Sequence, residues 1–496
     1  MPAASDHCGL HARLTPDKFA ARDLASGRSF TYRELNLAVG QFAAGFAARG
    51  VGAGDRVAIL ARNRVDCVLA HLACARLGAI YVPLNWRLSA TEIKALLTDA
   101  EPRLLLGDAS LAAMGLDGIA LDDFAAEAFG LSPLDEAPGD PDRPSLILYT
   151  SGTSGRPKGV LLSERNIEQT AINFSVLGRV THQSVFLCDA PMFHVIGLIT
   201  NIRPAMMQGG AFLVSDGFVP PRTLARLGDS SLGITHYFCV PQMASALRAE
   251  PGFDPARLGG LTALFTGGAP NPAADIRAWL ADGVPMVDGY GLSEAGTVFG
   301  MPLDLALIDA HAGSAGLATP ALRTRIVDGE GKDCVTGDPG ELLLKGDNIT
   351  RSYWRRPEDT KSAFTADGWF RTGDIVRADA HGYHWIVDRR KDMFISGGEN
   401  IYPAEIEAVL AGYPGIAECA LVGVPDTRWG EVGHLFLVAV SGAVLEPENI
   451  LAHISGRLAR YKVPKHVSVM EALPRNGAGK VLKTELRNKP VGAKNQ

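Results

Sequence analysis

Short apolar runs alternate with amphipathic stretches along the first hundred residues. Residues 31–34 (Thr-Tyr-Arg-Glu) form a capping box, and the apolar residues within 35–46 recur on one helical stripe. Residues 55–60 have the pattern of a buried strand, a stretch rich in Ala and Leu continues as a helix to about Leu77, and residues 79–84 form a second strand pattern. Strand, helix and strand in this order predict parallel βαβ units and an α/β domain.

The same alternation resumes after residue 300 and changes character near residue 390. Residues 340–345 predict a strand, and a dense charged run follows at residues 388–392. Charge runs are usually solvated and suit a linker, so we expect a domain boundary there. The C-terminal part is expected to contain a helix opened by Pro403, strands at residues 417–423 and 435–440, and a helix at residues 450–461.

Bulk properties narrow the class of protein. The chain has 496 residues, which is more than a single hydrophobic core usually contains, so two or more domains are expected. Its formal charge of -6 gives no sign of a nucleic-acid partner. Seven cysteines without a CxxC pair fit reduced thiols and a cytoplasmic protein. Residues 1–19 lack the apolar core of a signal peptide, and residues 68–84 are interrupted by His71 and Arg76, so no transmembrane segment is expected. The sequence is compatible with peripheral membrane contact and with a homodimer.

The strongest chemical motif lies at residues 146–159, where a strand pattern enters a loop of hydroxyls, glycines and one cation. Backbone N–H groups can approach an anion closely across small residues, and a lysine adds charge, so the loop predicts a polyphosphate cradle. It is not a Walker A loop, because Lys158 is followed by Gly159. The candidate residues of this loop are Thr150, Ser151, Gly152, Thr153, Ser154, Gly155 and Lys158.

Three further clusters carry chemistry. In residues 288–294, glycines flank an aromatic that can frame a flat base, and Glu294 offers a hard oxygen ligand for magnesium. In residues 369–374, Asp374 follows a tight turn and can accept hydrogen bonds from ribose hydroxyls. In residues 475–480, a glycine loop presents Lys480 near the C-terminus. Each cluster taken alone also fits an ordinary surface turn.

In this order and spacing, the four clusters resemble the adenylate-forming superfamily of acyl-CoA synthetases, luciferases and peptide-synthetase adenylation domains. The resemblance runs from about residue 31 to residue 487. Further matching segments lie at residues 191–197, 266–270, 340–342, 388–406 and 461–464. The resemblance implies a large N-terminal domain of α/β subdomains plus a β-rich subdomain (residues 1–388, AMP-binding). It also implies a small mobile α/β C-terminal domain that acts as a lid (residues 389–496).

The resemblance also implies roles in nucleotide binding. Residues 150–155 and Lys158 would hold the β- and γ-phosphates, and Glu294 the magnesium ion. Asp374 and Arg389 would hold the ribose. The residues that would surround the adenine and the α-phosphate are Gly268, Ala269, Asp288, Gly289, Tyr290, Gly291 and Ser293. Ser293 stands where the family usually has Thr, and Asp288 where many relatives carry an amide.

Two lysines of the C-terminal part would separate the two half-reactions. Lys480 would contact both the attacking carboxylate and the α-phosphate, because one anion must attack another. Lys391 occupies the hinge position about which the small domain rotates before CoA enters. Gly397 and Gly398 would then line the pantetheine tunnel.

The acid pocket implied by the resemblance is almost entirely small or apolar. Its positions are Ile196, Thr200, Phe265, Gly267, Gly289, Gly291, Thr297 and Val298. His194, which we include among the catalytic residues, replaces the aspartate that amino-acid-activating relatives use for the amine. Arg203 is the one nearby charge that would suit a dicarboxylate, and the simpler interpretation is an arginine on a helix surface. An apolar acid is therefore favoured.

The sequence thus predicts an ATP-dependent carboxylate:CoA ligase that uses ATP, Mg²⁺ and coenzyme A. A medium- or long-chain fatty acid is favoured, because hydroxycinnamate ligases often carry Tyr where Ile196 stands. An aryl-CoA ligase of the hydroxycinnamate or feruloyl type, a fatty-acyl-AMP ligase and a luciferase-like oxygenase stay open as alternatives. A P-loop kinase is excluded by the loop chemistry.

Overall fold

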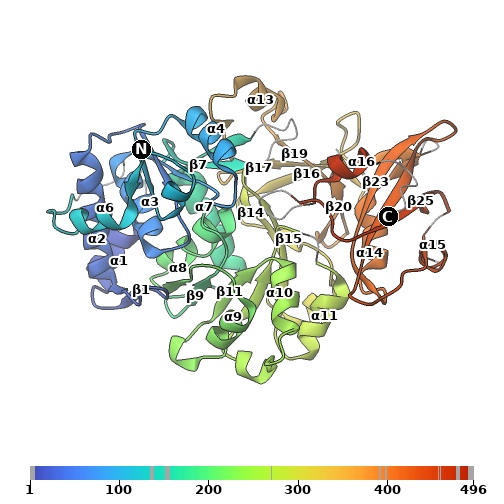
Figure 1. The fold of residues 1–496 in the computed structure, drawn as a ribbon, viewed down its shortest axis with the longest axis horizontal. Helices are drawn as coiled ribbons and strands as arrows, with labels where there is room; N and C mark the ends of the chain where they lie inside the picture. The colour runs from blue at the N-terminus through green and yellow to red at the C-terminus, as the bar shows by residue number, and fades with distance from the viewer. Residues whose placement is uncertain are drawn as a thin grey trace. The chain divides into compact units, whose positions relative to one another are not determined.

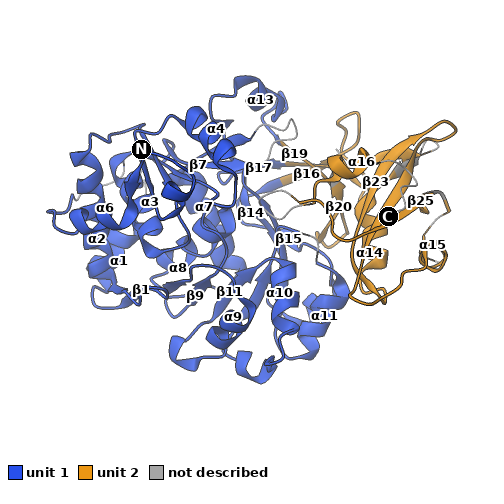
Figure 2. Ribbon diagram, in the orientation of Figure 1, with its two compact units in different colours: residues 1–323, 344–370 blue, residues 324–343, 371–496 orange. Residues whose placement is uncertain are grey.

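The computed structural model divides the chain into two compact units (Figure 2). Unit 1 contains residues 1–323 and 344–370, and unit 2 contains residues 324–343 and 371–496. The boundary predicted after residue 388 falls within strand β20 (His384–Arg389), and it stays a prediction. The residues that the structure describes are 6–134, 139–150, 157–269, 271–389, 392–396, 399–455, 457–458, 460–475 and 481–489.

One sheet of unit 1 confirms the predicted βαβ rhythm. Its order is β18-β8-β7-β4-β3-β5-β6, and β3 pairs in parallel with both β4 and β5. Buried residues from these strands pack with Ile93 and Leu96 into one apolar core. The strands are β3 (Arg56–Leu60), β4 (Ile80–Pro83), β5 (Leu104–Gly107), β6 (Ile119–Ala120), β7 (Pro144–Thr150), β8 (Lys158–Ser163) and β18 (Ser352–Tyr353).

Local sequence signals explain the first long helices. The capping box is confirmed at α2 (Tyr32–Ala48), where the Thr31 hydroxyl accepts the Glu34 N–H and the Glu34 carboxylate accepts the Thr31 N–H. Helix α3 (Val65–Leu77) is buried on nearly every side, polar His71 and Arg76 included. The apolar tract that these two residues interrupt is therefore an interior helix followed by strand β4.

The second sheet of unit 1 has the order β15-β14-β13-β12-β11-β9-β10-β1-β2. Its central strands run parallel, so the carboxyl ends of β12 and β13 lie side by side at one edge, where ligands bind in open α/β sheets. The strands are β1 (Phe19–Asp23), β2 (Ser29–Thr31), β9 (Val185–Cys188), β10 (Ala211–Val214), β11 (His236–Cys239), β12 (Ala263–Thr266), β13 (Met286–Leu292), β14 (Gly296–Gly300) and β15 (Leu317–Ala318).

Helices cover these sheets within unit 1 (Figure 1). Helix α2 packs against α3 and α6, and α7 packs against α8 and the π-helix η1. The remaining helices described in unit 1 are α1 (His7–Leu14), α4 (Ala90–Ala100), α5 (Ser110–Ala113), α6 (Leu121–Ala128), α7 (Glu164–Leu177), η1 (Ile196–Thr200), α8 (Arg203–Met207), α9 (Pro220–Leu227), the 3₁₀ helix η2 (Ser230–Leu232), α10 (Pro241–Arg248), the 3₁₀ helix η3 (Pro255–Leu258), α11 (Ala273–Ala281), α12 (Leu305–Ala310) and α13 (Pro357–Ser362).

Unit 2 contains two smaller sheets. One has the order β16-β17-β19-β20, and in the other β22-β21-β24-β23 is extended by β25 beside β24. The predicted strand at residues 340–345 is confirmed as β17. The elements of these sheets are β16 (Arg323–Val327), β17 (Gly340–Lys345), β19 (Phe370–Ala378), β21 (Phe394–Ser396), β22 (Glu399–Ile401), β23 (Ile416–Asp426), β24 (Gly430–Ala439) and β25 (His466–Met470).

The helix predicted at residues 450–461 is too long and starts too late. Helix α15 covers Pro447–Ser455, and a separate 3₁₀ turn covers Arg460–Lys462. The apolar spacing continues beyond the helix because Leu458 and Val463 also pack against the core of this domain. Helix α14 (Pro403–Leu410) begins at the predicted proline, and α16 (Lys483–Arg487) follows near the end of the described chain.

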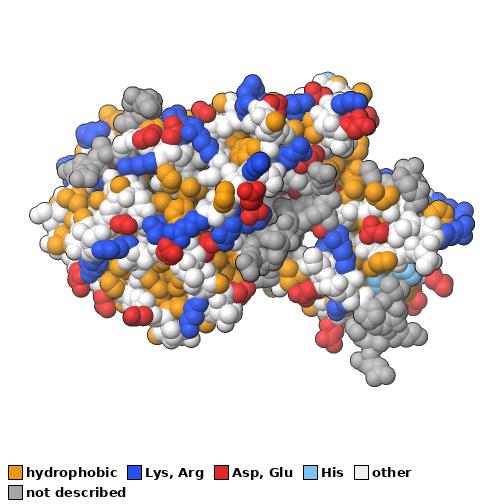
Figure 3. Space-filling model, turned by 90° about the horizontal axis from the view of Figure 1, so that it is seen from above, with side chains coloured by type: hydrophobic (Ala, Val, Ile, Leu, Met, Phe, Trp, Pro, Cys, Tyr) orange, Lys and Arg blue, Asp and Glu red, His pale blue; other side chains and the backbone are white. Residues whose placement is uncertain are grey.

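The surface carries charges of both signs, and the cysteines are free thiols. Acidic and basic side chains are interspersed on the face shown in Figure 3. All seven cysteines are free, and burial raises the pKa of most of them. Within the described residues, no helix combines the length and the apolar character needed to cross a membrane.

Candidate functional site

Strands β7 and β8 position the predicted phosphate loop. They pair antiparallel with Thr150 opposite Lys158, so the two ends of the loop are held together, and the Thr150 hydroxyl donates to the Lys158 carbonyl at 3.4 Å. The other predicted residues of the loop lie outside the described part of the chain; they are Ser151, Gly152, Thr153, Ser154 and Gly155.

The Lys158 ammonium has two partners that sequence reasoning missed. Its Nζ donates to Asp359 Oδ1 at 2.5 Å and lies 5.6 Å from the centre of the Tyr353 ring. Asp359 is in the first turn of α13 and Tyr353 is in β18, about two hundred residues farther along the chain. No local pattern indicates such a contact, because it depends on the pairing of β18 with β8.

The same tyrosine reaches the predicted magnesium ligand. The Tyr353 hydroxyl donates to Glu294 Oε1 at 2.9 Å, and the Glu294 carbonyl accepts the Thr350 N–H at 2.7 Å. Glu294 is half-buried, and because a carboxylate can accept several hydrogen bonds, the bond from the Tyr353 phenol does not by itself exclude a metal ion. Among the described residues, no group of three or more His, Cys, Asp or Glu could hold a metal. A single carboxylate can suffice for Mg²⁺, which is often held by one or two carboxylates together with substrate phosphates and water.

The predicted adenine site lies where β12 and β13 end. Thr266 and Asp288 are opposite each other in the parallel register. The Thr266 hydroxyl donates to Asp288 Oδ1 at 2.8 Å, and Asn271 donates to the same hydroxyl at 2.9 Å. Burial raises the pKa of Asp288 to about 8, against hydrogen bonds from Thr266 and the Gly289 backbone that lower it. At neutral pH, Asp288 is therefore largely protonated and can both donate and accept, as an amide does.

Glycines in the β13–β14 hairpin are required by close packing of the backbone. A Cβ on Gly291 would lie 2.3 Å from the Gly296 carbonyl oxygen. Gly289 and Tyr290 face Gly300 and Phe299, and the two rings stack with centres 5.6 Å apart. Next to this hairpin, Gly268 has φ +83, while Ala269 and Ser293 are half-buried. In this hairpin, the Tyr290 ring is thus supported by Phe299 and flanked along the chain by Gly289 and Gly291.

The predicted acid pocket gathers at the same edge of the sheet. A Cβ on Gly268 would lie 3.6 Å from Ile196 Cδ1 and 3.8 Å from Val240 Cγ1. A Cβ on Gly267 would lie 3.1 Å from the Phe238 ring. Phe238 and Val240 are wall residues that the sequence did not single out. The structure therefore brings Ile196 and the two glycines together.

The other pocket positions lie on neighbouring elements. Thr200 and Val298 are buried in η1 and β14, which contact each other, and Thr297 is half-buried in β14. Phe265 is buried with its ring 5.0 Å from Phe174. Phe265 also stacks on Phe238, with ring centres 6.4 Å apart.

The expectation of a surface position for Arg203 is wrong. Its side chain is 4% exposed and donates to Glu164 Oε2 at 2.6 Å, while Ser145 donates to the other oxygen at 2.6 Å. Burial raises the pKa of Glu164, but Arg203, His71 and Ser145 lower it to about 2 overall. A guanidinium engaged with a buried carboxylate is not available to a substrate.

His194 lies on a loop that a buried asparagine holds in place. Asn63 donates to the Ala190 carbonyl at 2.8 Å and accepts the Met192 N–H at 2.9 Å. Burial, together with the Arg87 guanidinium, lowers the pKa of His194 to about 4, so its imidazole is neutral at pH 7. Sequence reasoning did not identify Asn63, which acts only through its long-range contacts.

Among the candidate residues of unit 2, Asp374 is the one whose side chain the structure describes. Asp374 is buried in β19 opposite Arg389, and its N–H donates to the Thr372 hydroxyl at 3.0 Å. That hydroxyl donates in turn to the Leu342 carbonyl at 2.8 Å, which ties the turn to β17. The side chain of Arg389 and the residues Lys391, Gly397, Gly398 and Lys480 lie outside the described part of the chain.

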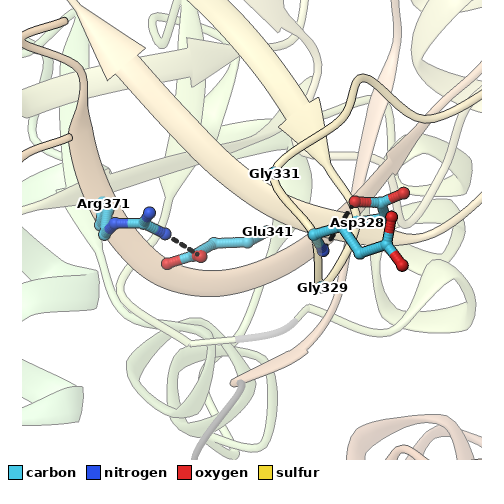
Figure 4. A pocket seen from close by; sticks show the side chains of 6 residues that line it. Asp328, Gly329, Gly331, Glu341 and Arg371 are labelled. Atoms are coloured by element: carbon cyan, nitrogen blue, oxygen red, sulfur yellow. Dashed lines mark hydrogen bonds and ion pairs between the residues drawn. The ribbon is translucent and has the colours of Figure 1, made fainter. Parts of the chain in front are cut away.

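A hollow of about 270 Å³ lies in unit 2 (Figure 4). It is lined by the turn at residues 328–331 together with Glu341 and Arg371, which form an ion pair at 2.8 Å. Asp328 accepts hydrogen bonds from the backbone of its own turn. These carboxylates therefore serve the local structure.

Comparisons with known proteins match nearly the whole chain. The family described as AMP-binding enzyme matches residues 10–354, and the AMP-binding enzyme C-terminal domain matches residues 405–480. A feruloyl-CoA synthase of Amycolatopsis sp is 38% identical, covering 96% of this chain and 97% of that protein. The long-chain-fatty-acid–CoA ligase FadD13 of Mycobacterium tuberculosis is 37% identical, covering 96% of each.

A solved structure agrees with these sequence matches. The crystal structure of ATP-bound MatB from Rhodopseudomonas palustris superposes with a TM-score of 0.88 at 33% identity, covering 97% of this chain and 98% of that one.

The Glu164–Arg203 pair allows a test of stability. Arg203→Met leaves a buried carboxylate without its counter-ion and should lower the free energy of unfolding by about 3–5 kcal/mol. The double variant Glu164→Gln/Arg203→Met removes both charges and should recover a large part of that loss. Urea denaturation of the three proteins measures both values. Equal destabilisation of the single and the double variant would contradict the assignment.

Asp288 predicts a pH dependence with a defined sign. Its pKa in the folded state, about 8, is above the unfolded value, so the folded protein binds the extra proton between about pH 4 and pH 8. The free energy of unfolding should therefore fall as pH rises through this window, by on the order of a few kcal/mol. Asp288→Asn should remove this component. The thermal midpoints of the wild-type protein and of Asp288→Asn, measured at pH 5, 6.5 and 8, test this prediction. If the midpoints of the two proteins depend on pH in the same way, the prediction is wrong.

Proposed function

The chain belongs to the family of AMP-binding enzymes, as an AMP-forming acid–CoA ligase that uses ATP, Mg²⁺ and CoA, and we propose that its acid is apolar, with a medium- or long-chain fatty acid as first candidate. The relatives act on different acids, so the choice of acid depends on the pocket of this chain.

One observation carries the proposal of an apolar acid: the nearby arginine is engaged elsewhere. Arg203 is buried against Glu164, and the wall that approaches Gly267 and Gly268 is formed by Ile196, Phe238 and Val240. Burying a second carboxylate against apolar side chains without a cation is strongly unfavourable. An uncharged acyl tail instead gains about 25 cal/mol for each Å² of apolar surface removed from water.

An aryl acid is the second candidate, and Phe238 favours it. This ring is half-buried, stacks on Phe265, and approaches Gly267, so a flat substrate ring could pack beside it. The similarity to a feruloyl-CoA synthase supports the same candidate. Against it, Ile196 offers no hydrogen bond to a ring hydroxyl, which would be costly to bury unpaired.

The proposed chemistry has two steps. A carboxylate oxygen attacks the α-phosphorus of ATP, the new O–P bond forms as the bond to the β-phosphate oxygen breaks, and pyrophosphate leaves. The CoA sulfur then attacks the acyl carbon, the C–S bond forms, AMP leaves, and the thiol proton is released.

We assign the charged groups of the first step as follows. The loop at residues 150–155 and Lys158 would bind the β- and γ-phosphates, Glu294 the metal, and Asp374 with Arg389 the ribose. Lys480 would bridge the two reacting anions. A cation about 4 Å from each anion contributes on the order of 4 kcal/mol at an effective dielectric near 20.

The domain boundary after residue 388 and a hinge at Lys391 belong to this proposal, as does a cytoplasmic location. The free, reduced thiols support the location. Rotation about the hinge would move Lys480 away and open a path for the CoA thiol past Gly397 and Gly398.

The choice of acid can be tested with a panel assayed for AMP release with and without CoA. Fatty acids of six to sixteen carbons, ferulate, and dicarboxylates such as malonate form the three arms. We expect CoA-dependent AMP release with fatty acids, and dicarboxylates slower by at least roughly 100-fold. Higher kcat/KM with ferulate would favour the aryl candidate. A preference for malonate would overturn the apolar assignment, and release without CoA would favour transfer to a carrier protein.

Two lysine variants should affect different steps. Lys480→Ala should lower acid-dependent pyrophosphate exchange at least ~100-fold, the scale seen when a donor to the transition state is lost. Lys391→Pro should stop thioester formation while sparing exchange, because proline restricts φ at the hinge. Exchange that survives in the first variant, or equal damage to both steps in the second, would contradict these roles.

A further inference from the structure

A tyrosine separates two opposite charges at the phosphate end of the candidate site. Tyr353 lies opposite Val160 in the antiparallel pairing of β18 with β8, and Lys158 is two residues from Val160 on the same face of β8. This register places the Lys158 ammonium 5.6 Å from the centre of the tyrosine ring. The hydroxyl at the far end of that ring donates to Glu294 at 2.9 Å. One side chain thus contacts both the cation and the anion.

Helix α13 supplies a second partner for the cation. The Tyr353 N–H donates to the Thr360 hydroxyl at 3.0 Å, and that hydroxyl donates to the Arg356 carbonyl at 2.8 Å, so the first turn of α13 is fastened to β18. Asp359, within this turn, accepts a hydrogen bond from Lys158 Nζ at 2.5 Å. The two side chains are 21% and 35% exposed, so solvent weakens the pair and a ligand can reach it.

We propose that Asp359 is a displaceable counter-ion that competes with the nucleotide polyphosphate for Lys158, while Tyr353 is a positioning residue that holds Glu294 toward the metal. Asp359 carries one negative charge, whereas a triphosphate carries several and therefore wins the competition. The phenol O–H is the donor in this contact, because the Glu294 carboxylate can only accept. This inference rests on the proposed roles of Lys158 and Glu294 in binding ATP.

Calorimetric titration of the full-length protein with MgATP, without any acid, tests the counter-ion. Asp359→Asn should lower the Kd for MgATP roughly twofold to fivefold, since it removes a competitor worth no more than a partly exposed ion pair. Glu358→Gln is the matched control, because it removes the same charge from an exposed position in the same turn. Its Kd should stay within about twofold of the wild-type value.

A double-mutant cycle distinguishes a contact from a general charge effect. In the Lys158→Met background, Asp359→Asn should change the Kd no further, because the cation for which the two anions compete is absent. Weaker or unchanged binding by Asp359→Asn alone would overturn the proposal. So would an equal gain from Glu358→Gln, or a gain that persists without Lys158.

Tyr353→Phe tests the positioning role with a different measurement. The ring stays beside Lys158 but the hydrogen bond to Glu294 is lost, so half-saturation of ATP binding by Mg²⁺ should require roughly tenfold more metal. The affinity for ATP at saturating Mg²⁺ and the thermal midpoint should change little. If Tyr353 had a purely structural role, the substitution would lower both. An unchanged Mg²⁺ dependence would overturn this role. These titrations use no acid, so a failed acid panel leaves them interpretable.

Discussion

The proposed nucleotide chemistry of unit 1 depends on keeping a cation and an anion near each other without mutual neutralisation. Lys158 follows the predicted phosphate loop and Glu294 follows β13. The Tyr353 ring contacts Lys158, and its hydroxyl contacts Glu294. A buried ion pair between these two groups would leave neither for a ligand, whereas the pair that Lys158 makes with Asp359 is partly exposed. A tyrosine between them provides a weak contact for the ammonium and a directed hydrogen bond for the carboxylate.

Elsewhere in unit 1, the opposite arrangement occurs. Arg203 and Glu164 are buried together with Ser145 and His71, and their charges neutralise each other inside the protein. Such a pair holds β7, α7 and α8 together but offers nothing to a substrate. The Arg203–Glu164 pair is buried, whereas the Lys158–Asp359 pair is partly exposed. This difference distinguishes a structural ion pair from one that we propose a ligand displaces.

The proposed acid pocket offers a physical reason why relatives in one family act on different acids. The glycines near the ends of β12 and β13 are determined by close approach of backbone and ring, as at Gly267 and Gly291. Side chains from other elements, Ile196 and Phe238 among them, form the wall that an acyl group would meet. Under the proposed assignments, replacing these wall residues would change the acid without disturbing the nucleotide site, because Ile196 lies on η1 and Phe238 on β11, whereas Asp288 and Tyr290 lie on β13.

Local patterns in the sequence determined much of the fold. The capping box at Thr31, the strand at Gly340–Lys345 and the βαβ order follow from hydrogen bonds and periodicities that span only a few residues. The same short-range pattern predicted too long a helix at residues 450–461. Apolar residues continue at similar spacing after α15 ends, because that segment also packs against the core although it is not one continuous helix. The order of four motifs along the chain was sufficient for the family.

Only the tertiary structure decided what those motifs contact. Asp359 lies 201 residues beyond Lys158, Arg203 is 39 residues from Glu164, and Thr266 meets Asp288 through the register of two strands. Burial then sets the state of each group: it neutralises His194 and protonates Asp288, while the partners of Glu164 keep it charged. A linear sequence specifies the side chains, but pairing and desolvation depend on distances that only the folded chain establishes.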